Sequence, residues 1–139
     1  MQYTKQLFLA ALMVTPLLAT AQMGHTVAIA SQVPFEFVVG DRVIPSGKCI
    51  VQAAPTASET VLIRNDDATV RLFSSLSLAE TREIPTTDEL VFHKYGDRYF
   101  LSEIRVEGSR IIYQLPQSKE EAAFRQRNQP SSEETIHAF

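Results

Sequence analysis

The chain has 139 residues, 45% of them hydrophobic and 21% charged, and its formal net charge at pH 7 is −3. This length suits a single folded domain behind a leader segment. The mildly acidic balance argues against a nucleic-acid partner, which would require a basic face. The sequence also has no cluster of Lys and Arg suited to anionic lipid.

Residues 1–21 have the three parts of a secretory signal peptide. Lys5 supplies the positive start, an apolar stretch follows over residues 7–18, and Ala19-Thr20-Ala21 provides the small residues that signal peptidase needs. We expect cleavage before Gln22 and a location in the periplasm or outside the cell. The pattern Ala28-Ile29-Ala30 is a less favourable second cleavage site. The apolar stretch is shorter than the roughly 20 residues of a membrane span, so no span is expected in the mature chain.

Residues 22–31 are expected to form a flexible lead-in to a β-rich domain over residues 32–127. The first predicted strand, 32–39, alternates in polarity, and Pro34 places its beginning at a sheet edge. The residues of this strand that would face the core are Val33, Phe35, Phe37 and Val39.

Further strands are expected along the chain, separated by turn signals at intervals of about 8–12 residues. They cover residues 48–53, 60–64, 69–73, 90–95, 98–104 and 110–115, and residues 74–81 favour a continuation of the strand 69–73. No long segment with helical periodicity separates them, which argues against a parallel βαβ sheet. The predicted fold is all-β, a single antiparallel sandwich or small barrel of about seven or eight strands with a short C-terminal helix.

The helix is predicted over residues 118–127. Ser118 and Glu121 form a capping box, in which each side chain satisfies a free backbone amide of the first turn. Residues 128–139 are polar and are expected to be a disordered tail.

Cys49 is the single cysteine of the chain, which excludes an internal disulfide. A buried, small hydrophobic side chain is the favoured interpretation. The alternatives are an intermolecular disulfide and a reactive thiol. A catalytic Cys49 would need His93 as its base, and no local motif supports that pairing.

The segment Leu90–Ile104, LVFHKYGDRYFLSEI, predicts a β-hairpin with Gly96-Asp97 as a type II′ turn. A two-residue loop would place Phe92 opposite Leu101, Val91 opposite Ser102 and Leu90 opposite Glu103. Both faces would be apolar in the middle and polar near the turn, which suits a central hairpin covered on both sides. The weak candidates for a binding site are its polar residues His93, Lys94, Tyr95, Arg98 and Tyr99.

A hydrolytic site is disfavoured, although His93, Ser102 and Glu103 are the right residue types. On a regular strand, Ser102 and Glu103 would point to opposite faces, and no nucleophile elbow surrounds Ser102. His, Cys, Asp and Glu have no spacing typical of a metal site. No cofactor, catalytic residue or metal ligand is therefore predicted.

Two segments carry a family resemblance: Val33–Gly40 with Ile44–Lys48, and Leu90–Glu103. Together with the Leu115-Pro116-Gln117-Ser118 helix start, they resemble an uncharacterised group of small exported proteins associated with acidobacteria. Cys49 stands where an aromatic residue is more usual in that group. The resemblance implies bacterial export and a single domain, and it implies no activity.

Three hypotheses for function follow. The first is an exported, non-enzymatic β-domain that binds an unknown protein or small ligand in the cell envelope or outside the cell. The second is a small hydrolase-like enzyme that uses His93. The third is an envelope protein that self-associates through an exposed edge strand, Val33–Val39.

Overall fold

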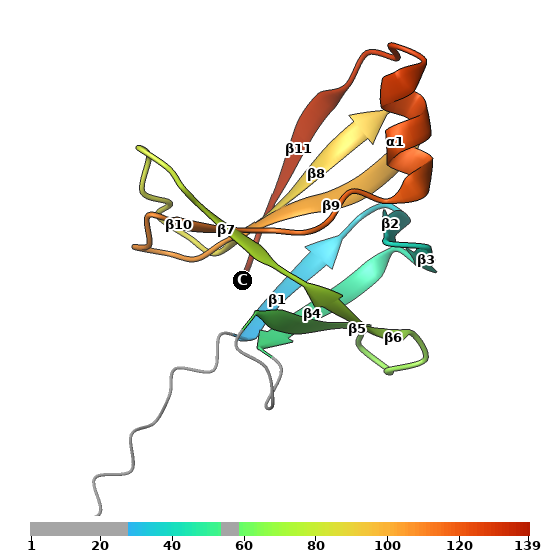
Figure 1. The fold of residues 1–139 in the computed structure, drawn as a ribbon. Coiled ribbons are helices and arrows are strands. Elements are labelled where there is room, and N and C mark those ends of the chain that lie inside the picture. The colour runs from blue at the N-terminus through green and yellow to red at the C-terminus, as the bar shows by residue number, and fades with distance from the viewer. Residues whose placement is uncertain (1–27, 54–58) are drawn as a thin grey trace, which may run out of the picture.

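The computed structural model describes residues 28–53 and 59–139, which form eleven strands and one helix (Figure 1). The helix, α1, spans Lys119–Gln126. The strands are β1 (Ala28–Val33), β2 (Phe37–Val39), β3 (Arg42–Ile44), β4 (Gly47–Ala53), β5 (Thr60–Asn65), β6 (Arg71–Ser75), β7 (Ser77–Glu80), β8 (Glu89–Tyr95), β9 (Arg98–Arg105), β10 (Ile111–Gln114) and β11 (Ser132–His137).

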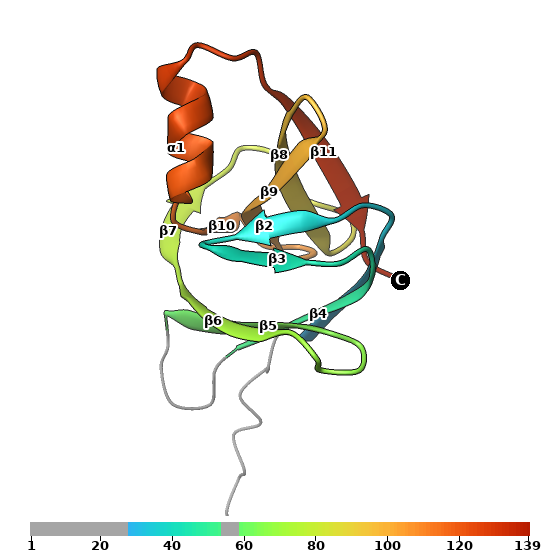
Figure 2. The same ribbon diagram turned by 90° about the vertical axis from the view of Figure 1, so that its right-hand side faces the viewer.

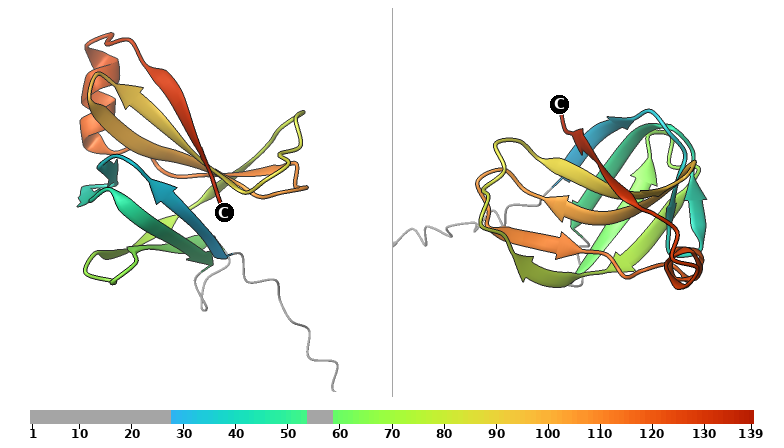
Figure 3. Two further views of the ribbon diagram at one scale, coloured as in Figure 1. Left: turned by 180° about the vertical axis from the view of Figure 1, so that it is seen from behind. Right: turned by 90° about the horizontal axis from the view of Figure 1, so that it is seen from above.

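The strands form two sheets that face each other (Figures 1 and 3). The first sheet has the order β1-β4-β5-β6, and the second has the order β11-β8-β9-β10-β7. In the second sheet, β2 also pairs in parallel with β9 and antiparallel with β3. The predicted fold class is confirmed as an all-β sandwich with a short C-terminal helix.

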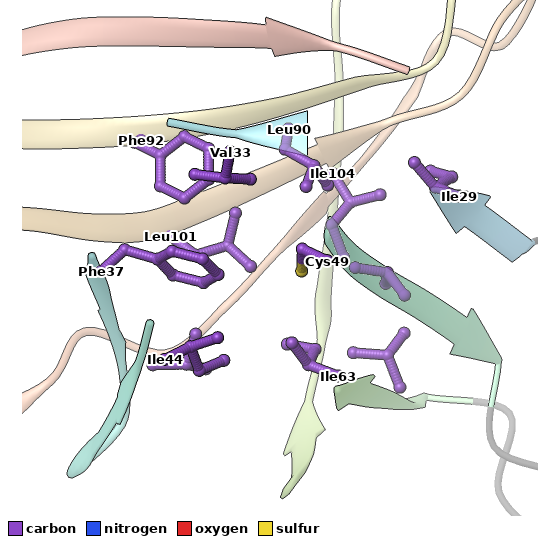
Figure 4. Packing of buried hydrophobic residues seen from close by; sticks show 13 residues of the cluster. Ile29, Val33, Phe37, Ile44, Cys49, Ile63, Leu90, Phe92, Leu101 and Ile104 are labelled. Atoms are coloured by element: carbon purple, nitrogen blue, oxygen red, sulfur yellow. The ribbon is translucent and has the colours of Figure 1, made fainter. Parts of the chain in front are cut away.

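The core lies between the two sheets, and Figure 4 shows its side chains in contact. Phe92 and Phe37, both from the second sheet, pack edge to face with 5.0 Å between their ring centroids. Ile63 of β5 and Cys49 of β4 meet them from the first sheet. Cys49 is 1% exposed, and burial raises the pKa of its thiol to about 12. Cys49 is therefore a neutral core residue, as the favoured interpretation predicted.

The predicted strand 32–39 is two strands that belong to different sheets. β1 ends at Val33 and β2 begins at Phe37, so the chain crosses between the sheets at Pro34–Glu36. Pro34 has no backbone N–H to continue a ladder, which favours the break there. β2 lies between β3 and β9 and is fully buried, so the expected exposed edge is wrong for Phe37–Val39. Val33 belongs to β1, which is an end strand of the first sheet.

Hairpin β8–β9 lies at the centre of the second sheet, between β11 on one side and β10 on the other (Figure 1). Gly96 has φ +57° and Asp97 has no positive φ, as a type II′ turn requires. The predicted register holds from Tyr95–Arg98 to Phe92–Leu101.

Beyond Phe92 the register shifts by a β-bulge. Val91 pairs with Glu103 and Leu90 with Ile104, so Ser102 is the extra residue on β9. The predicted pairs Val91–Ser102 and Leu90–Glu103 are therefore wrong. The bulge turns Ile104 into the core beside Leu90, where the regular register would have placed it on the outer face.

Helix α1 covers one end of the outer face of the second sheet, away from the core (Figure 2). Its N-cap is Ser118, whose hydroxyl accepts a hydrogen bond from the Glu121 backbone N–H at 3.0 Å. Phe124 stacks on Tyr95 with 5.5 Å between centroids and packs against Phe100. Both faces of the central hairpin are thus covered, as predicted.

The expected disordered tail is wrong. Residues Ser132–His137 form β11, which pairs with β8 from Lys94 to Glu89. Ile136 and Ala138 pack against the core, and the exposed ladder of β8 gives the polar segment its backbone partners. The predicted flexible lead-in, residues 22–31, is also too long. From Ala28 onward its residues belong to β1, which pairs with β4. The predicted signal peptide lies outside the described residues.

Removing β11 should destabilise the domain. A chain ending at Gln129 would leave the β8 ladder and the apolar contacts of Ile136 and Ala138 open to water. We expect a loss on the order of 2–4 kcal/mol in the free energy of unfolding by urea. Phe139→Ala is the control, because that side chain is 79% exposed and should leave stability unchanged. Equal stability of the truncated and full chains would contradict the role given to β11.

Candidate functional site

A carboxylate buried under helix α1 is the most unusual group of the outer face. Glu121 is 4% exposed, and its Oε1 lies 2.6 Å from His93 Nδ1. The Tyr95 hydroxyl donates a second hydrogen bond to the same oxygen at 3.2 Å. A buried carboxylate is costly unless it is paired and hydrogen-bonded, and these two partners meet that need. They also hold α1 against β8.

The second ring nitrogen of His93 contacts β9. Its Nε2 lies 3.1 Å from Ser102 Oγ. Ser102 reaches this position because it is the bulged residue, and bulges commonly redirect side chains in this way. Ser102, His93 and Glu121 therefore form one hydrogen-bonded row across three elements.

The Glu121 carboxylate determines the protonation of His93. Its hydrogen bond is the largest effect that raises the pKa of His93, its charge adds to the rise, and partial burial opposes it. Glu133 on β11 and Glu103 on β9 add smaller effects in the same direction. Burial is the main reason that the pKa of Tyr95 is also raised, so that its hydroxyl stays a donor.

A pocket of about 210 Å³ opens beside this row. Its lining is mostly polar, and the residues that line it are Ser77, His93, Leu101, Ser102, Gln114, Leu115, Gln117, Glu121 and Arg125. They come from β7, β8, β9, β10, α1 and the segment that leads into α1. The pocket thus lies where the outer face, the bulge and the helix meet.

A larger depression, of about 510 Å³, lies at the turns that follow β3 and β5. Its polar groups already bond to one another: the Asn65 amide donates to Thr69 Oγ1 at 2.7 Å, and Thr69 Oγ1 donates to Asp67 at 2.9 Å. Lys48 lies 3.4 Å from Asp66. These contacts explain the turn, and they leave the smaller pocket as the better candidate site.

The five predicted candidate residues do not form one cluster. His93 and Tyr95 contact Glu121, and Arg98 forms two 2.8 Å hydrogen bonds with Glu120 of α1. The remaining two, Lys94 and Tyr99, lie on the opposite face of the hairpin. There the Tyr99 ring stacks on Phe35 at 3.7 Å, with the Lys94 ammonium 5.3 Å from the Tyr99 ring centroid.

Sequence reasoning missed Ser102 and Glu121 as partners of His93. The capping box identified Glu121 as a helix-start residue, and nothing in its pattern indicated that its side chain would be buried against a strand. On a regular strand Ser102 and Glu103 would point to opposite faces, and the bulge at Ser102 changes that geometry. Because Glu103 pairs with Val91, it shares the face of His93, but its carboxylate bonds to Arg105 at 2.7 Å.

Comparisons with family models, with curated proteins and with solved structures found no match. Within residues 28–53 and 59–139, no three His, Cys, Asp or Glu side chains are grouped so that they could hold a metal ion. The helix in this part of the chain is too short and too polar to cross a membrane.

The His93–Glu121 contact predicts a pH-dependent stability. The pKa of His93 in the folded protein lies above the ordinary value of 6.5, so the folded state binds this proton more tightly than the unfolded state does. The stabilisation is complete below about pH 6.5 and is lost as the pH rises through the folded pKa. We expect the difference in unfolding free energy between wild type and Glu121→Gln to be larger at about pH 5.5 than at about pH 9.

The matched control for this experiment is Glu120→Gln, one residue earlier on α1. Glu120 pairs with Arg98 at the surface and does not contact His93. The coupling between His93 and Glu121 would be contradicted if the loss of unfolding free energy in Glu121→Gln were constant across the pH range. It would also be contradicted if that loss followed the same pH dependence as the loss in Glu120→Gln.

Proposed function

We propose that this chain is an exported, non-enzymatic β-sandwich domain that binds a small ligand through the pocket beside α1. The supporting observation is the pocket itself, in which side chains from several distant segments converge on one polar cavity. Ligand sites of this kind are concave, with a few converging polar groups that orient the bound molecule. Ser102, Gln117 and Arg125 supply groups able to donate hydrogen bonds there.

Export is supported by the N-terminal pattern of Lys5, the apolar stretch 7–18 and the small residues at 19–21. Burial of Cys49 agrees with this proposal, because a thiol kept neutral inside the core is protected from oxidation in an oxidising compartment. The ligand would then be met in the periplasm or outside the cell.

The protonation of His93 favours binding over catalysis. A general base must be unprotonated to accept a proton from a serine hydroxyl. The Glu121 carboxylate raises the pKa of His93, which increases the protonated share near neutral pH. A protonated ring donates from both nitrogens, so it would hold Ser102 and Glu121 in place and leave the hydroxyl unactivated.

A hydrolase is the second candidate, and the row Ser102–His93–Glu121 is the observation that favours it. A nucleophile, a base and a carboxylate that orients the base are the parts of a catalytic triad. In that function Ser102 Oγ would attack an ester carbonyl while its proton passed to His93 Nε2. His93 would then protonate the departing alcohol, and water would release the acyl group from Ser102.

The binding proposal predicts that a small molecule accompanies the protein. The full chain, expressed in a Gram-negative bacterial host, should be recovered from the periplasm with the mass of a chain that begins at Gln22.

Native mass spectrometry of the recovered protein should show an added mass that disappears on denaturation. Ser102→Tyr, which places a large ring at the pocket, should abolish the added mass, whereas Ser46→Tyr at the other depression should retain it. Recovery in the cytoplasm would contradict export, and retention of the mass by Ser102→Tyr would contradict the assigned pocket.

The hydrolase candidate predicts covalent capture by a fluorophosphonate probe. If Ser102 is a nucleophile, the probe should label the folded wild-type protein at Ser102, and Ser102→Ala and His93→Gln should both abolish labelling. The binding proposal predicts no labelling above that of the Ser102→Ala control. Stoichiometric labelling of Ser102 would overturn the non-enzymatic proposal.

A further inference from the structure

The charges around the pocket determine which ligands suit it. Arg125 lies four residues after Glu121 on α1, so the two side chains share one helix face. Arg125 is exposed and lines the pocket. Within the described residues, no salt bridge or side-chain hydrogen bond engages its guanidinium. Both carboxylate oxygens of the nearby Glu120 accept hydrogen bonds from Arg98 instead. A cation without an acidic partner therefore stands at the pocket.

Inside the pocket, His93 and Glu121 neutralise each other when the ring is protonated. The other ionisable groups facing His93 are Glu103 from β9, which bonds to Arg105, and Glu133 from β11, which is exposed. Arg125 then leaves the lining with one net positive charge. That balance suits a ligand with a single negative charge, because a second negative charge would find no cation in the lining to pair with it.

The remaining lining has two further properties. Gln114 and Gln117 contribute amide groups that can donate hydrogen bonds, and the half-buried Leu115 contributes apolar surface. The volume of about 210 Å³ equals that of roughly seven water molecules at about 30 Å³ each. A short chain with one polar end matches this combination of size and surface.

We propose that the pocket binds a small monocarboxylate, with its carboxylate at Arg125 and its short alkyl chain toward Leu115. The planar guanidinium presents two parallel N–H groups that match the two oxygens of a carboxylate. This inference rests on the proposed binding function and names its ligand class. The carboxylate belongs either to a free short-chain acid or to the C-terminus of a peptide.

The test is a titration of the mature protein followed by the NMR signals of the His93 ring, assigned with His93→Gln. The probes are sodium butyrate, sodium acetate and sodium sulfate, at constant ionic strength and about pH 6.5, where a substantial share of His93 is protonated. Butyrate should give a saturable shift of the His93 ring signals, from which its dissociation constant is obtained. Acetate should bind more weakly because it lacks the alkyl chain, and sulfate should not saturate.

Two arginine variants make the test specific. Arg125→Gln should weaken butyrate binding at least tenfold, because it removes the charge and keeps a similar size. Arg127→Gln is the matched control, because Arg127 is the exposed C-cap of the same helix and does not line the pocket. This variant should bind butyrate with the affinity of the wild-type protein. Unchanged butyrate affinity in Arg125→Gln, or sulfate binding as tight as butyrate binding, would overturn the proposal.

A peptide comparison distinguishes the two sources of the carboxylate. Acetyl-Ala-Ala with a free carboxyl group should bind more tightly than butyrate if the natural ligand is a chain terminus, and more weakly if it is a free acid. Its amidated form should not bind in either case, and binding of the amide would contradict the inference. If butyrate and the peptide both fail while native mass spectrometry shows a retained molecule, the carboxylate class is wrong and the binding function stands. If no molecule is retained either, both fail.

Discussion

The outer face of this sandwich depends on one buried carboxylate. Glu121 enters an environment from which water is nearly excluded, and a charge in that position requires partners close by. His93 and Tyr95 provide them from a single strand, on alternate residues that share a face. The same contacts hold α1 in place, because a shift of the helix would separate the buried Glu121 carboxylate from both of its partners. The pocket exists because α1 is held there.

A β-bulge supplies the second constraint. One extra residue on β9 brings Ser102 Oγ to 3.1 Å from His93 Nε2 and turns Ile104 toward the core. Core packing and pocket geometry are therefore linked at a single irregularity in the sheet. A regular hairpin would leave His93 with one partner and would place the polar residues on two faces.

Much of the fold could be predicted from the sequence because it follows from local signals. Short-range patterns record the turn at Gly96-Asp97 and the cap at Ser118, because each acts over a few residues. The same holds for the alternating polarity that turns Phe35 and Phe37 toward the core. The break at Pro34–Glu36 and the strand β11 could not be predicted in this way. Each exists because a distant strand provides hydrogen-bond partners, and a sequence pattern does not record that strand's position.

The candidate site was only half predictable for the same reason. His93 stands out in a strand-like segment, but its two partners depend on tertiary structure. Glu121 lies 28 positions away in the chain, and its capping pattern is the same whether its side chain meets water or a histidine. Ser102 depends on the bulge, which follows from the packing of Leu90 and Ile104 and leaves no signature of its own.

The central claim is that His93 and Glu121 act on each other across the helix–sheet boundary. A double-mutant cycle with His93→Gln, Glu121→Gln and the double variant, unfolded by urea at about pH 5.5, measures this directly. If the account is correct, the single losses will not add, and the coupling free energy will be on the order of 1 kcal/mol or more. Additive losses, with a coupling free energy near zero, would show that the two side chains are neighbours without a shared role and would contradict the account.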